Sequence, residues 1–184
     1  MTGQLGEPVG EPVGEPVRAL VVSVSTRAAT GVYLDRTGPY LVGALTDLGF
    51  EVDGPRVVPD GDPVEQVLRD AVGRGYDVVL TTGGTGVSPT DRTPEATRRV
   101  VEREVPGIAE AIRAHGAGAG VPTAVLSRGV AGMVARTLVV NLPGSPGGCR
   151  DGMAVLRGVL EHAVSQLRGG DHRPGGGVPA TEPA

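Results

Sequence analysis

The stretch DVVLTTGGTGVSPTDRTPEAT, residues 77–97, decides the fold. Its first part is an apolar run that ends at Thr82, which predicts a strand buried on both faces of a sheet. Its last part predicts a helix that begins at Thr93, because Thr93 followed by Pro94 is typical of a cap and a first helical turn. We expect this helix to extend to about Glu104.

The same alternation of strand and helix continues on both sides of this stretch. Apolar, β-like runs cover residues 19–25, 50–58 (one strand or two), 123–127, 132–135 and 137–143. Helical patterns cover residues 39–49, 62–74, 108–115 and, as one final helix, 153–167. Strands that alternate with helices indicate an open, mostly parallel α/β sheet. Such sheets bind ligands beyond the carboxyl ends of their strands.

The two ends of the chain have a different composition from its middle. Residues 1–17 contain GEPVGEPVGEPV, three copies of a four-residue unit that cannot pack a core. Residues 169–184 are similarly rich in glycine and proline. We therefore predict a disordered repeat arm at 1–17, one folded domain at 18–168 and a disordered tail at 169–184.

Composition excludes several classes of function. Aromatic residues make up 2% of the chain, so a base-stacking surface for single-stranded nucleic acid is not expected. All 17 basic residues are arginine, which excludes a Walker A lysine, and the net charge of -4 disfavours nucleic acid as a partner. A single cysteine, Cys149, rules out a disulfide framework. No apolar run reaches membrane-spanning length and no signal peptide is recognisable, so we expect a cytoplasmic protein without a membrane partner.

The glycines Gly83, Gly84 and Gly86 follow directly after the strand that ends at Thr82. Backbone N–H groups that turn inward there can form an anion-binding nest, to which Thr82 and Thr85 would add hydroxyl donors. A tight turn that needs positive φ would explain the same glycines. The dinucleotide fingerprint fails, because proline stands where its third glycine belongs.

Two aspartates are candidates for the chemistry. Asp91 follows Gly86 by five residues, and a carboxylate beside a phosphate nest repels the ligand unless a cation such as Mg²⁺ bridges them. An aspartate in a turn before a helix is the alternative explanation. Asp60 follows the second strand region and would reach the same rim, although its PDGDP context by itself favours an ordinary turn.

A second glycine-bearing loop, residues 139–148, also follows a strand. There Asn141 offers an amide, Gly144 permits close approach, and Ser145 offers a hydroxyl or a helix cap. A nucleophile elbow is absent, because Pro143 replaces its first glycine. Ser25 ends the first strand in a similar way, and Arg128 could bind a phosphate or a carboxylate.

Six motifs in this order resemble one family. LVVSVSTRAATGVYLDRTG, VVPD, TTGGTGVSPTDRTPEAT, EVPGIAEAIR, AVLSRGVAG and VVNLPGSP are similar to the MoaB and MogA proteins of molybdenum cofactor biosynthesis and to domains of gephyrin. The similarity covers about residues 19–167. It implies a three-layer αβα fold with a mostly parallel sheet, usually assembled as a homotrimer. It also implies a molybdopterin adenylyltransferase, which transfers AMP from Mg-ATP to molybdopterin before a molybdate-insertion enzyme acts.

The resemblance also assigns site residues. Asp91 and Asp60 match the acidic catalytic positions, with Mg²⁺ coordination as their expected role. This match favours a catalytic role for Asp60 over the interpretation as an ordinary turn residue. Positions for substrate and nucleotide binding match Ser25, Thr82, Gly83, Gly84, Thr85, Gly86, Ser127, Asn141, Pro143, Gly144 and Ser145. The chain departs from the family in lacking lysine and in its glycine-rich GSPGGCRDG segment. A non-catalytic pterin-binding or scaffold member of the family is the alternative.

Overall fold

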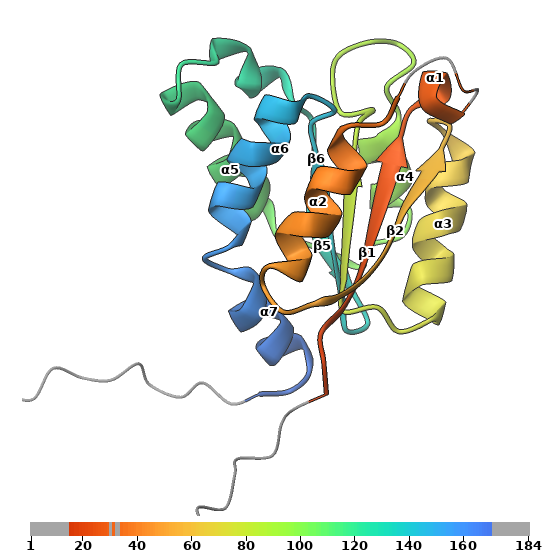
Figure 1. Cartoon of the computed structure of the whole chain (residues 1–184), viewed down its shortest axis with the longest axis vertical. Coiled ribbons are helices and arrows are strands. Elements are labelled where there is room, and N and C mark those ends of the chain that lie inside the picture. The colour runs from red at the N-terminus through yellow and green to blue at the C-terminus, as the bar shows by residue number, and fades with distance from the viewer. Residues whose placement is uncertain (1–14, 30, 32–33, 171–184) are drawn as a thin grey trace, which may run out of the picture.

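The computed structural model describes residues 15–29, 31 and 34–170, and Figure 1 shows one sheet covered by helices. Almost all of the predicted arm and tail lies outside the described residues. The strands are β1 (Arg18–Val24), β2 (Glu51–Val58), β3 (Val78–Thr82), β4 (Arg103–Glu104), β5 (Ala131–Val134) and β6 (Thr137–Leu142). Their order is β2-β1-β3-β6-β5-β4. The pairs β1–β2, β1–β3 and β3–β6 are parallel, whereas β5 is antiparallel to both β6 and β4.

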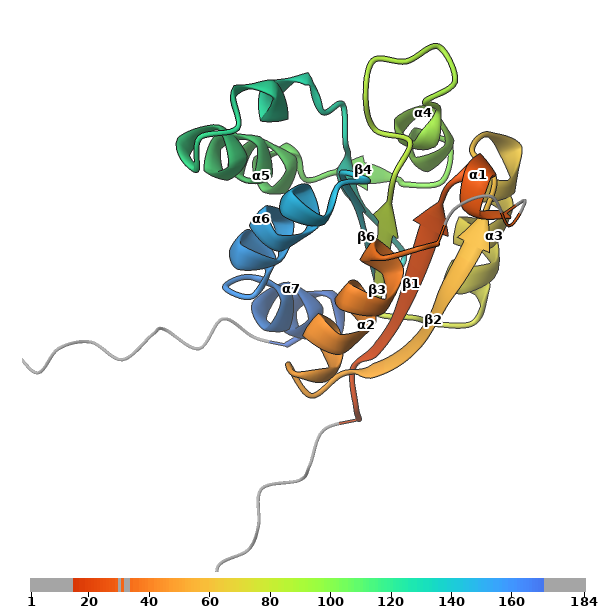
Figure 2. The same cartoon turned by 45° about the horizontal axis from the view of Figure 1, so that its top comes forward.

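The helices lie on both faces of this sheet, as Figure 2 shows. They are α1 (Thr26–Ala29), α2 (Thr37–Thr46), α3 (Asp62–Gly73), α4 (Thr93–Arg98), α5 (Pro106–Gly118), α6 (Pro146–Leu156) and α7 (Leu160–Leu167), with a 3₁₀ helix, η1 (Pro122–Leu126). Alternate residues of β1 belong to different core clusters: Val21 lies in the cluster that contains Leu45 of α2 and Leu156 of α6, whereas Leu20 lies in the cluster that contains Leu68 of α3. The predicted three-layer α/β fold is confirmed.

Three predicted elements differ from the structure. The helix that begins at Thr93 ends at Arg98, not near Glu104, because Arg103 and Glu104 pair with β5 as an edge strand. The β-like run at 123–127 is η1, which begins at Pro122 and leaves Val125 exposed. Because these apolar residues lie outside the sheet, their preference for β structure does not determine the conformation of the segment.

The predicted final helix is in fact two helices. α6 begins at Pro146 and is capped by Ser145, as one interpretation of Ser145 predicted; the Ser145 hydroxyl accepts a hydrogen bond from the Gly148 N–H. The helical pattern breaks between Leu156 and Leu160, so that α7 packs separately against the core. Apolar spacing alone did not reveal this break because both helices present their apolar residues to the same side of the sheet.

The parallel register brings several loops to one edge of the sheet. Thr82 of β3 lies opposite Ser23 of β1 and Leu142 of β6. Ser25, Gly83 and Pro143 therefore leave three adjacent strands at nearly the same level. We call this edge, where β1, β2, β3 and β6 end, the carboxyl edge of the sheet.

Candidate functional site

The turn Gly83–Gly86 forms the centre of the carboxyl edge. Gly83 and Gly84 have φ angles of 105° and 64°, which favour glycine, and a side chain at Gly83 would collide with the Val24 carbonyl. Hydrogen bonds among the described residues leave the N–H groups of Gly84, Thr85 and Gly86 unused. The segment is thus a tight turn that requires glycine, and it also presents free amide donors.

Asp60 lies against this turn from the loop between β2 and α3. A side chain at Gly84 would collide with the Asp60 carboxylate and with the Thr93 hydroxyl. The carboxylate accepts hydrogen bonds from the N–H of Gly61 (2.7 Å), the N–H of Arg92 (3.1 Å) and the hydroxyl of Thr93 (3.3 Å). Asp60 therefore organises a turn and the start of α4, and it also lines the glycine turn.

Asp91 lies against the same turn at Gly86, two residues after Gly84. A Cβ atom at Gly86 would come within 2.7 Å of Asp91 Oδ2. That oxygen accepts a weak hydrogen bond from the Ser88 N–H at 3.3 Å. Within the described part of the chain, neither Asp91 nor Asp60 forms an ion pair with an arginine or histidine.

These two carboxylates suit a magnesium ion better than a transition metal. No group of three or more His, Cys, Asp or Glu side chains in the described ranges is placed to hold a metal. Mg²⁺ typically needs only one or two carboxylates, with phosphate oxygens and waters as its remaining ligands. The donor set at this edge fits that requirement.

Two cavities flank the glycine turn. The first, about 360 Å³ and here called the Ser127 cavity, is lined by Gly84, Thr85, Gly86, Asp91, Val121, Thr123, Ala124, Leu126, Ser127, Pro143, Gly144, Ser145, Gly147, Gly148 and Asp151. The second, about 240 Å³ and here called the Asp35 cavity, is lined by Ser23, Val24, Ser25, Ala28, Asp35, Arg36, Thr37, Thr82, Gly83, Gly84, Gly144 and Pro146. Gly84 and Gly144 border both, so the two cavities meet at the turn.

The loop after β6 closes the site from the other side. A Cβ atom at Gly144 would come within 3.1 Å of the Gly83 backbone, so the two glycine loops touch. The Thr82 hydroxyl donates to the Pro143 carbonyl at 2.9 Å and ties the two strand ends together. The N-terminus of α6 borders the Ser127 cavity, and a helix N-terminus favours an anionic ligand there.

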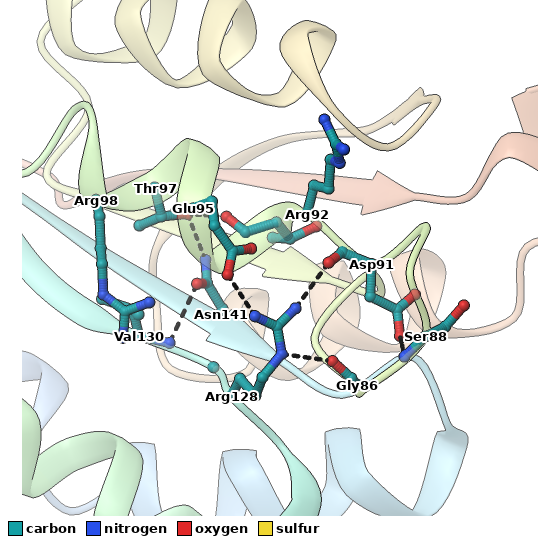
Figure 3. A network of polar contacts seen from close by, with 12 residues as sticks. Gly86, Ser88, Asp91, Arg92, Glu95, Thr97, Arg98, Arg128, Val130 and Asn141 are labelled. Carbon is teal, nitrogen blue, oxygen red and sulfur yellow. Dashed lines mark hydrogen bonds and ion pairs between the residues drawn. The ribbon is translucent and has the colours of Figure 1, made fainter.

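Among the predicted site residues, Asp60 and Asn141 line neither cavity; Asp60 still lies against Gly84, whereas Asn141 is buried. Its side chain is 3% exposed and borders neither cavity. The amide donates to the hydroxyls of Thr81 (3.0 Å) and Thr97 (2.9 Å) and accepts from the Val130 N–H (3.1 Å), as Figure 3 shows in part. Asn141 thus joins β3, β6 and α4 beneath the site.

Cys149 is buried next to the site, and its surroundings disfavour the reactive thiolate form. Its thiol contacts the Thr82 hydroxyl at 3.2 Å and donates to the Pro143 carbonyl at 3.3 Å. Burial raises the pKa of the thiol to about 11, with the hydrogen bond to Thr82 opposing the shift. The reactive thiolate form is therefore scarce near neutral pH.

Sequence reasoning missed two carboxylates that line the cavities. Asp35 accepts hydrogen bonds from the Ser23 hydroxyl (2.6 Å) and from the N–H groups of Thr37 and Gly38 (both 3.0 Å). An aspartate shortly before a predicted helix is a capping signal that could have identified it. Asp151, in the second turn of α6, borders the Ser127 cavity, and no sequence motif marks it.

A family model described as "Probable molybdopterin binding domain" matches residues 20–162 of this chain. The chain belongs to that family. It is a member of the MoaB/MogA group of molybdenum cofactor biosynthesis proteins, as the order of its motifs predicts.

None of the helices in the described ranges has the length and apolar character needed to cross a bilayer.

Individual relatives agree with this assignment. The chain is 46% identical over 132 residues to the molybdopterin adenylyltransferase of Haemophilus influenzae, which covers 68% of this chain and 66% of that protein. A solved MogA structure is 55% identical to this chain, with a TM-score of 0.80. The alignment covers 82% of this chain and 99% of the MogA chain. MoaB from Thermus thermophilus is 45% identical, with a TM-score of 0.77, over 83% of this chain and 97% of its own. The chain spans 48% of the length of a curated bifunctional relative from Synechococcus elongatus and 66% of the Haemophilus influenzae protein.

Proposed function

We propose that this protein is a molybdopterin adenylyltransferase. An oxygen of the terminal phosphate of molybdopterin attacks the α-phosphorus of ATP, the bond from that phosphorus to the bridging oxygen breaks, and its electron pair leaves with pyrophosphate. One observation carries the proposal: Asp60 and Asp91 lie against Gly84 and Gly86, with no arginine neutralising either carboxylate in the described residues. The name of the Haemophilus influenzae relative supports the same reaction.

The charges at the turn explain how the reaction would be assisted. Free N–H groups at Gly84, Thr85 and Gly86 would bind phosphate oxygens, while Asp60 and Asp91 would hold the Mg²⁺ of the nucleotide. When bound, Mg²⁺ neutralises charge on the phosphates. The attacking phosphate oxygen is already charged, so no general base is required. The protein contributes positioning and electrostatic stabilisation.

The two cavities would give each substrate a place to bind. Since the Ser127 cavity and the Asp35 cavity share Gly84 and Gly144, two ligands that occupy them would meet at the glycine turn. A two-substrate transfer needs such a meeting point, because holding both reactants removes the entropic cost of their encounter. The Ser127 cavity also borders the N-terminus of α6, which favours a phosphate-bearing ligand.

The test is direct. Purified protein is incubated with molybdopterin and Mg-ATP, and adenylylated molybdopterin and pyrophosphate are measured together. We expect both products in equal amounts and neither when Mg²⁺ is removed with a chelator. Binding of molybdopterin without pyrophosphate release would contradict the proposal and favour a non-catalytic pterin-binding or scaffold protein.

Three further expectations from the sequence and the family resemblance stay predictions. They are a homotrimeric assembly, a cytoplasmic location and transfer of the product to a molybdate-insertion enzyme. Light scattering of the purified full-length chain would test the first of them.

A further inference from the structure

The segment between Gly86 and Asp91 is exposed, and the hydrogen bonds that its residues form with one another, including the 2.9 Å contact between the Ser88 and Thr90 hydroxyls, all lie between Ser88 and Asp91. Val87 is 67% exposed, and Ser88, Pro89 and Thr90 are exposed as well. The Asp91 N–H donates to the Ser88 carbonyl at 2.9 Å, and the Ser88 N–H donates weakly to the Asp91 carboxylate. A short exposed turn of this kind does not by itself fix a carboxylate beside Gly86.

Arg128 holds this segment from outside. Its backbone N–H donates to the Thr85 carbonyl at 2.8 Å, and its Nε donates to the Gly86 carbonyl at 2.7 Å. Its Nη2 donates to the Asp91 carbonyl, also at 2.7 Å. One guanidinium therefore spans the two ends of the segment, as Figure 3 shows.

Glu95 of α4 holds Arg128 in turn. Its Oε1 accepts from Arg128 Nη1, whereas its Oε2 is buried with no hydrogen-bond partner among the described residues. Burial raises the pKa of Glu95, but the Arg128 guanidinium, a backbone hydrogen bond and the charge of Arg98 together outweigh burial and hold the pKa below its ordinary value. Glu95 is therefore ionised at neutral pH and depends on Arg128 for compensation of its charge.

We propose that Arg128 is a positioning residue of the adenylyl transfer, which places the Asp91 carboxylate against Gly86 by binding the carbonyls at both ends of the segment. Glu95 keeps the guanidinium in the orientation that this requires. The inference rests on the proposed function, and it differs from the expectation that Arg128 binds a phosphate. The Nε, Nη1 and Nη2 groups of Arg128 each already have a partner within the protein.

Substitution by lysine separates positioning from a merely structural role. In Arg128→Lys the ammonium still compensates Glu95 but cannot reach both carbonyls, because it lacks the planar fork of the guanidinium. We expect Arg128→Lys to keep the thermal stability of wild type while kcat falls about tenfold to a hundredfold. The Mg²⁺ concentration for half-maximal activity should rise, with the KM for molybdopterin nearly unchanged. Arg128→Gln should show the same kinetic changes and lower stability.

Arg98→Gln is the matched control. Arg98 is on α4 like Glu95, and it pairs with Glu104 at 3.0 Å in an exposed ion pair, but among the described residues it forms no hydrogen bond to the segment from Gly86 to Asp91. We expect wild-type kinetics for this variant. A wild-type kcat and Mg²⁺ dependence for Arg128→Lys would overturn the proposal, and so would a rise in the KM for ATP or molybdopterin with kcat unchanged.

Amide hydrogen exchange tests the positioning without any turnover. In the substrate-free protein, Arg128→Gln and Glu95→Gln should speed exchange at the Asp91 N–H, which donates to the Ser88 carbonyl, and to a smaller extent at the Ser88 N–H, while exchange in β3 stays at its wild-type rate. Unchanged exchange at the Asp91 N–H would refute the positioning role. Inactive wild-type protein would refute only the proposed function, since the exchange result would still show whether Arg128 holds the segment.

Discussion

Carboxylates at the two edges of the parallel sheet differ in their burial and in the groups that bind them. At the edge where the strands begin, Asp77 is 1% exposed, and Arg168 donates to both of its oxygens at 2.9 and 2.7 Å. The N–H of Arg18 adds a third hydrogen bond at 2.9 Å. At the carboxyl edge, Asp60 and Asp91 are half-buried and are held by N–H and hydroxyl groups alone among the described residues.

This difference indicates that aspartate stabilises the fold at one edge, as Asp77, and supports the cation-binding role proposed for Asp60 and Asp91 at the other. A fully buried carboxylate needs a compensating cation from the protein itself, since an unpaired charge in the interior is costly. A half-buried carboxylate that is satisfied by dipoles keeps its negative charge available to a cation from solution. Substitutions at the two edges should therefore affect different measurements.

The largest effect is expected for Asp91→Ala. The rate of AMP transfer should fall by about two to three orders of magnitude, since Asp91 is assigned to charge stabilisation at the transfer site. The melting temperature should stay within about 2 °C of wild type, because the carboxylate makes one weak hydrogen bond. Product formation and thermal unfolding measure the two quantities. Asp47→Ala, at a carboxylate that is 73% exposed, is the control, and an unchanged rate in Asp91→Ala would refute its role.

At the other edge, Arg168→Gln should lower stability without lowering turnover. It leaves Asp77 buried without its cation, for which we expect a loss of about 3 kcal/mol in the free energy of unfolding. Urea unfolding measures this loss. Arg157→Gln, which removes a weak surface pair at 3.9 Å, should change stability by less than about 0.5 kcal/mol. Equal effects of the two substitutions would mean that burial of Asp77 is not what makes its pairing important.

The pH dependence sharpens this second prediction. Burial raises the pKa of Asp77, but the hydrogen bonds from Arg168 and from the Arg18 N–H outweigh it and hold the pKa below its ordinary value of 3.8. A lowered folded-state pKa contributes stability above the unfolded value, and this contribution is lost as the pH falls through the folded-state value. The stability gap between wild type and Arg168→Gln should thus be constant near neutral pH and shrink below about pH 4. A gap that persists in acid would contradict a charge-based origin.

The smallest effects come from a pair of glycine substitutions. Gly84→Ala places a side chain at φ 64° against Asp60 and Thr93, and it should cost about 1–3 kcal/mol of stability and reduce turnover. Gly43→Ala, at an exposed position of α2 with open space around it, should instead stabilise the protein by about 0.5–1 kcal/mol with no change in turnover. Chemical unfolding and the transfer assay measure both variants. Gly84→Ala with wild-type behaviour would show that the turn tolerates a side chain.

Most of the architecture could be predicted because buried parallel strands and amphipathic helices leave strong local patterns. β1, β3 and β6 are continuous apolar runs, and Pro63 and Pro94 mark helix starts within the first turn. The errors occurred where pairing between distant segments overrides local preference. Arg103 and Glu104 continue a helical pattern but pair with β5, and the apolar run in η1 is not one of the six strands that form the sheet in the described residues.

Residue order alone determined that this chain folds as a three-layer α/β domain of the molybdopterin-binding family and that glycines lie at the end of a central strand. Only the tertiary structure decided that Asp60 and Asp91 share the glycine turn, that Asn141 is satisfied beneath it, and that Arg128 binds both ends of the segment from Gly86 to Asp91. The physical reason is that strand and helix patterns are local in sequence. A site, by contrast, is assembled from loops whose proximity depends on strand order and register.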